Sequence, residues 1–167
     1  MDEYNWKIET ADLKNGWNDV YLTFDEASVF GKPNLKALNY FRIFSTEVNE
    51  NIVLILDNVY ATNDVLGDSA YSETESEHGK MIMSCNTSKI FSSLTNMKLT
   101  TKKGEFVEGT GAFKAQYFTA EKKILSHGVL ANPVNISGYE KGSVHLSLYV
   151  NDVSKLKNAV TFELSSS

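Results

Sequence analysis

The chain has 167 residues, a mass of 18.6 kDa and a net charge of -5, with a sequence pI of about 5.2. This length fits one domain with a core that needs no disulfides, and the acidic balance argues against a nucleic acid partner, which would require a basic patch. No apolar run approaches the roughly 20 residues of a membrane-spanning helix, and the start of the chain shows no leader sequence.

The first third of the chain contains a series of short predicted strands. Tyr4, Trp6 and Ile8 alternate with polar residues, as side chains of a half-buried strand do. Similar patterns predict strands at 18–24 (NDVYLTF), 40–45 (YFRIFS) and 52–61 (IVLILDNVYA). The segment 24–32 (FDEASVFGK) is expected to supply no more than a turn or two of helix.

Residues 63–79 (NDVLGDSAYSETESEHG) differ from the rest of the chain. They contain several carboxylates, Ser and Gly and no Lys or Arg, which is the composition of a linker or surface loop. They divide the chain into a front piece, 1–62, and a back piece, 80–167. Neither piece has the strands to close two packed sheets, so we expect both to share one core in a single domain, 1–167.

The back piece is also predicted to be β. Its strand-like runs, separated by Gly, Asn, Ser and Lys clusters, lie at 80–85, 111–119, 127–136, 143–150 and 159–164. Helix is limited to a turn or two within 151–158. Many short strands at this spacing predict an all-β sandwich or barrel.

The two ends of the chain raise the question of where the last predicted strand finds its partner. The phrases LKNGWNDVYLTFDEA, GKPNLKALNYFRIF and VLILDNVYA resemble, in this order, the closing half of a β jelly-roll module of secreted bacterial glycan-active and surface proteins. The back piece, from KMIMSCNTSKIFSS to AVTFELSSS, resembles the opening half of the same module. Joining the two ends would restore the order of the family, so we expect the last strand to pair with the first.

This resemblance, to carbohydrate-binding-module-like and galactose-binding-domain-like modules, implies a two-sheet antiparallel β-sandwich with a circularly permuted strand order. Two complementary half-units of a tandem array are an alternative. The resemblance also implies a module of a larger protein that is extracellular or at the cell surface.

Asp57 is the first candidate for a metal ligand, since it interrupts an apolar run and its charge needs compensation. The resemblance implies a structural Ca²⁺ held by an Asp at this position, with Asn86 and Glu108 as neighbouring ligands. The sequence Ser84-Cys85-Asn86 departs from the commoner acidic residue of the family at this strand. A hydrogen-bonded or salt-bridged Asp57 without metal is the alternative.

The first functional hypothesis is a non-catalytic glycan-binding module. Such modules stack exposed aromatic rings on sugars and hydrogen-bond the hydroxyl groups with polar side chains. The candidate rings are Tyr60, Tyr71, Tyr117 and Tyr139. By contrast, Trp17 is interpreted as a packing anchor at a strand entry, and Arg42 as the partner of a carboxylate.

The second hypothesis is a structural spacer or adhesin module that binds no sugar and assembles with its neighbours. A monomer is expected, with domain swapping as the alternative. No enzyme is predicted, because the sequence has no GxSxG, phosphate-loop or HExxH motif and His78, His127 and His145 lack zinc-site spacing. Cys85, the only cysteine, is expected to be buried and inert.

Overall fold

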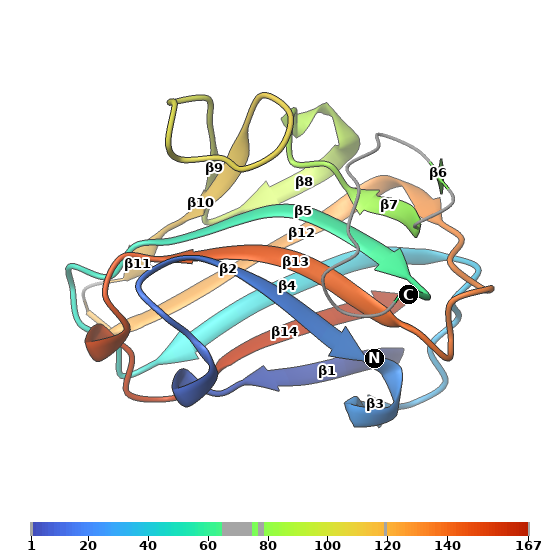
Figure 1. The fold of residues 1–167 in the computed structure, drawn as a ribbon, viewed down its shortest axis with the longest axis horizontal. Helices are drawn as coiled ribbons and strands as arrows, with labels where there is room; N and C mark the ends of the chain where they lie inside the picture. Colours follow the sequence, from blue (N-terminus) through green and yellow to red (C-terminus); the bar gives the residue numbers. More distant parts are fainter. Residues whose placement is uncertain (1, 65–74, 77–78, 119, 167) are drawn as a thin grey trace.

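The computed structural model describes residues 2–64, 75–76, 79–118 and 120–166. These residues form two antiparallel sheets of β-strands, with four short 3-10 turns between them (Figure 1). The two-sheet antiparallel β-sandwich predicted from the sequence is confirmed. Within the described part of the chain, no helix is long and apolar enough to cross a membrane.

Sheet A has the strand order β11-β12-β4-β14-β1-β3, and β8 also pairs with β12. In chain order its strands are β1 (Asp2–Ile8), β3 (Ser28–Phe30), β4 (Leu38–Thr46), β8 (Phe91–Thr95), β11 (Tyr117–Phe118), β12 (Lys123–Val134) and β14 (Val160–Ser166). Figure 1 shows β14 between β4 and β1. The prediction that the last strand pairs with the first is therefore confirmed, with Trp6 opposite Phe162 in the register.

Sheet B has the order β2-β13-β5-β10-β9, with β7 on β5 and β6 on β7. In chain order its strands are β2 (Gly16–Thr23), β5 (Leu54–Thr62), β6 (Glu75–Ser76), β7 (Gly79–Met83), β9 (Met97–Thr100), β10 (Ala112–Ala115) and β13 (Ser143–Val150). The predicted linker, 63–79, lies mostly outside the described residues, and its described part includes β6.

The 3-10 turns are η1 (Thr10–Asp12), η2 (Phe24–Glu26), η3 (Ser88–Ile90) and η4 (Val153–Lys155). Helix in 24–32 and 151–158 is thus limited to single turns, as predicted. One difference is β3, which forms where the sequence suggested a turn. Its β-branched and aromatic residues, Val29 and Phe30, suit a strand, and Val29 lies opposite Tyr4 of β1.

The core lies between the two sheets and draws on both pieces of the chain. The rings of Trp6 and Phe41, from the front piece, stack on Phe162, from the back piece, with centroids 6.3 and 6.5 Å apart. Leu146 and Phe113 are fully buried in the same cluster. Burying each such side chain contributes about 1.5–3 kcal/mol to folding, so neither piece is expected to keep this core by itself.

Candidate functional site

The outer face of sheet B carries a row of aromatic and polar side chains. Strands turn alternate side chains to opposite faces, and the register of β2 with β13 forms three pairs on the face away from the core: Trp17 with Tyr149, Asp19 with Ser147, and Tyr21 with His145. Tyr60 of β5 lies on the same face, stacked on His145. We call the five rings Trp17, Tyr21, Tyr60, His145 and Tyr149 the aromatic face.

The aromatic face has a ring cluster at each end. Trp17 and Tyr149 are half-buried and meet edge to face, with centroids 5.5 Å apart. At the other end Tyr21 is also half-buried, and its ring centroid lies 4.9 Å from that of His145. Trp17 and Tyr21 are four residues apart on β2, or about 13 Å at the usual rise of a strand. Asp19 lies between them, and its side chain is 68% exposed.

His145 connects the exposed and buried parts of this face. Its ring is 1% exposed, with Nδ1 3.0 Å from the carbonyl oxygen of Asn58 and Nε2 3.0 Å from Oδ1 of Asp19. Both neighbours are hydrogen-bond acceptors, and the imidazole ring lies between them. Asn58 has a φ of 51° and lies where the register of β5 with β13 shifts, and this bulge aims its carbonyl at the ring. His145 therefore fixes the position of the Asp19 carboxylate.

The loop 101–111, here called the covering loop, is fastened to this face through Asp57. Asp57 is fully buried. Its Oδ2 accepts hydrogen bonds from the N–H groups of Val107 and Glu108, at 2.8 and 3.0 Å, and Oδ1 accepts one from Asn58 at 2.8 Å. Burial raises the pKa of Asp57 to about 6, the three N–H donors oppose this, and the Glu108 carboxylate adds to the rise.

Two further contacts hold the covering loop. Oδ1 of Asn86 accepts hydrogen bonds from the N–H groups of Thr110 and Gly111, at 2.9 and 3.3 Å. The indole Nε1–H of Trp17 donates to the carbonyl oxygen of Gly104 at 3.4 Å. The covering loop is thus hydrogen-bonded both to Asp57 of β5 and to Trp17 of β2.

The predicted calcium ligands Asp57, Asn86 and Glu108 do meet at this loop, but their contacts do not fit a cation. The oxygens of Asp57 and Asn86 face main-chain N–H donors, whereas Ca²⁺ is held by several oxygen ligands. Among the described residues, no group of three or more His, Cys, Asp or Glu side chains is placed to hold a metal. The geometry fits the alternative, a hydrogen-bonded Asp57.

The four tyrosines predicted from the sequence to bind a glycan do not lie together in the structure where it describes them. Tyr60 is buried, only 3% exposed, so its ring is not available to stack on a ligand and that expectation is corrected. Tyr139 is half-buried and packs against the core. Tyr117 lies in β11, opposite Ile124, and Tyr71 lies outside the described residues.

Trp17 lies at the start of β2 and packs on Tyr149, as expected of a packing anchor at a strand entry, but its half-buried ring lies on the outer face of sheet B and not in the core. The sequence pattern that points to the aromatic face is the spacing Trp17-x-Asp19-x-Tyr21, because alternate residues of a strand lie on the same face. The expectations for Arg42 and Cys85 are confirmed. Arg42 pairs with the Glu163 carboxylate at 2.6 Å. Cys85 is buried, and burial, with a smaller contribution from Asp57, raises its pKa well above the usual value.

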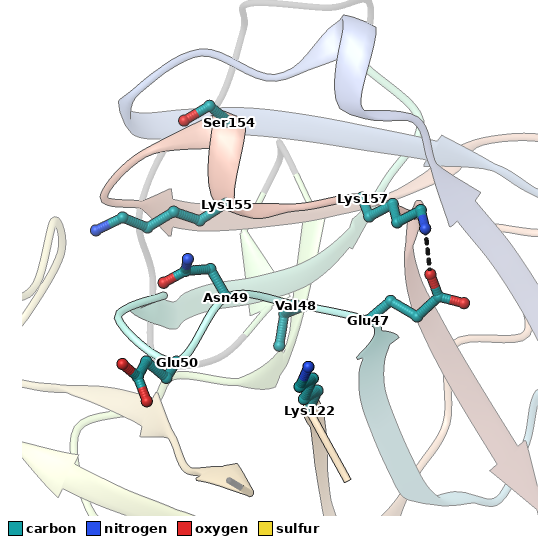
Figure 2. A pocket seen from close by; sticks show the side chains of 8 residues that line it. All are labelled: Glu47, Val48, Asn49, Glu50, Lys122, Ser154, Lys155 and Lys157. Atoms are coloured by element: carbon teal, nitrogen blue, oxygen red, sulfur yellow. Dashed lines mark ion pairs between the residues drawn. The ribbon is translucent and has the colours of Figure 1, made fainter.

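Hollows elsewhere on the described surface have less specific linings. One of them, of about 510 Å³, is lined by loop residues around Val48 and by Ser154 and Lys155 of η4 (Figure 2). Its lysines and glutamates partly neutralise each other, as in the ion pair of Lys157 with Glu47 at 2.7 Å. It has no aromatic side chain in its lining. A second hollow, of about 530 Å³, lies on sheet A beside Phe44 and Asn158.

No protein-family model, curated protein or solved structure matches this chain. We therefore infer a function from the geometry of the aromatic face.

Proposed function

We propose that the chain is a non-catalytic glycan-binding module and that the ligand lies along the aromatic face. The observation that carries the proposal is the half-buried ring pair of Trp17 and Tyr149 on the outer face, with the exposed carboxylate of Asp19 beside it. Aromatic rings of this kind stack on the apolar faces of sugars, and a carboxylate accepts hydrogen bonds from their hydroxyl groups. Trp is also a residue that often dominates binding energy.

The contacts around these groups support a preformed site. Trp17 is held by Gly104 of the covering loop, and Asp19 is held by the buried His145. Fixed side chains lose little conformational freedom on binding, which favours affinity. The span of about 13 Å between Trp17 and Tyr21 suits a short oligosaccharide better than a single sugar.

The charges favour a neutral glycan. Asp19 provides an exposed negative charge at the centre of the face, and the chain as a whole carries a net charge of -5. An acidic polysaccharide would be repelled by both. Asp57, another carboxylate of the outer face, is buried and bonded to three N–H groups. It is therefore unsuited to be a second catalytic carboxylate for glycoside hydrolysis.

The location of the module and its fold family are part of the same proposal. An extracellular or cell-surface module, in a circularly permuted jelly roll, follows from the resemblance of the sequence phrases to such modules. A non-binding spacer is the competing function, and it predicts no glycan ligand at all.

The test is a binding screen against neutral and acidic polysaccharides of plant, microbial and host origin, with the wild-type protein and Trp17→Ala. We expect binding to a neutral polysaccharide and a loss of more than about 2 kcal/mol, at least 30-fold in Kd, in the variant. Phe44→Ala, which removes a half-buried ring from the outer face of sheet A, is the matched control and should bind normally. If the folded wild-type protein bound none of the polysaccharides, the result would favour a structural spacer without sugar binding.

A further inference from the structure

Strand β3 forms one edge of sheet A. It pairs with β1, and no described strand pairs with its other side; Figure 1 shows it at the rim of the sandwich. Two of its three residues are large and apolar, and both are exposed, Val29 by 53% and Phe30 by 52%. An edge strand with unpaired backbone groups and exposed apolar side chains is a template for another strand.

The charges on either side of β3 have opposite signs. Asp25 and Glu26 precede the strand and Lys32 follows it, and all three are exposed. When two copies of such a segment pair antiparallel, the acidic end of each lies beside the basic end of the other. A register centred on Val29 brings Glu26 near Lys32 of the second copy, and this happens twice because a two-fold contact is self-complementary.

We propose that β3 pairs antiparallel with β3 of a second copy of this chain, across a two-fold axis, so that the two A sheets join. The exposed Val29 side chains then lie opposite each other, Phe30 lies opposite Ser28 of the second copy with the two Phe30 rings as diagonal neighbours, and the flanking charges set the register. Only three residues pair on each side, so the dimer is expected to be weak and reversible, like other small interfaces. The proposal is independent of the aromatic face, which belongs to sheet B.

Sedimentation of the full chain over a concentration series up to the millimolar range tests the proposal. We expect the average mass to rise from the 18.6 kDa of one chain toward twice that value. Glu26→Lys and Lys32→Glu should each weaken the dimer at least 10-fold, because like charges then face each other. An equimolar mixture of the two variants should restore dimers, since each acidic end again meets a basic one.

Lys89→Glu, which makes the same charge change at an exposed residue of η3, is the control and should dimerise like the wild type. Thermal melts of all variants check that the fold is intact. A chain that stays monomeric at every concentration would overturn the proposal. The proposal would also be overturned if Glu26→Lys and Lys32→Glu dimerised as strongly as the wild type, or if their equimolar mixture failed to form dimers.

Discussion

The outer faces of the two sheets use similar residues in different ways. On sheet A, Arg42 donates from Nε and Nη2 to the two carboxylate oxygens of Glu163, both at 2.7 Å, and Asn5 donates to the same carboxylate at 2.7 Å. On sheet B, Asp19 and Trp17 keep exposed surface beyond their contacts. Polar groups whose hydrogen bonds are all made within the protein stabilise the fold. Groups that are held in position but still exposed can also bind a ligand.

The comparison implies that changes on sheet A affect mainly stability. Arg42→Met would leave the buried Glu163 carboxylate without its cation. Removing one partner of a buried pair costs about 3–5 kcal/mol, and we expect a loss near the lower end because Arg42 itself is partly exposed. Urea unfolding measures this loss, and glycan affinity should not change.

Lys157→Met, which breaks the exposed ion pair with Glu47, is the control and should have a much smaller effect. Equal losses in the two variants would show that the Glu163 network adds no special stability. A loss of affinity in Arg42→Met would show that sheet A takes part in binding.

The next largest expected effect is on sheet B, where the Asp57 carboxyl group makes the free energy of unfolding depend on pH. Because its pKa is raised from the ordinary 3.8 to about 6, its contribution to stability is fully present below about pH 3.8 and is lost as the pH rises to about 6. The difference corresponds to about 3 kcal/mol. Asp57→Asn carries no charge, so its stability relative to the wild type should improve by about this amount between pH 3.5 and 7.

Urea unfolding of both proteins at several pH values checks this prediction. A difference between variant and wild type that stays constant over the whole range would mean that the pKa of Asp57 is not raised by burial.

The smallest expected effect is that of a chelator. Since Asp57 and Asn86 face N–H donors, EDTA should leave the melting temperature unchanged, with or without added Ca²⁺. A lower melting temperature in EDTA that Ca²⁺ restores, and that is absent in Asp57→Ala, would reinstate the calcium site.

Much of the fold could be predicted from the sequence because alternation is a local property. The runs around Ile55 and Leu146 predicted strands, and the pairing of the two terminal strands followed from the resemblance. The site was harder, because alternation shows that Trp17 and Leu22 of β2 lie on opposite faces but not which loops cover each face. The bonds that fix the covering loop join Asp57 to Val107, 50 residues away in the sequence.

Local alternation also could not show that the ring of Tyr60 is buried. It does lie on the outer face, as a binding residue would, yet its ring is buried against His145, 85 residues further along the chain. Only the fold places these two rings together.

The most direct test of the aromatic face uses the two tryptophans as reporters. Each indole N–H gives its own NMR signal: that of Trp6 donates to Thr23 and lies in the core, and that of Trp17 donates to Gly104 at the aromatic face. On titration with an oligosaccharide from the polysaccharide that binds, we predict that the Trp17 signal shifts in proportion to occupancy while the Trp6 signal does not. Binding that leaves the Trp17 signal in place would contradict the proposed site.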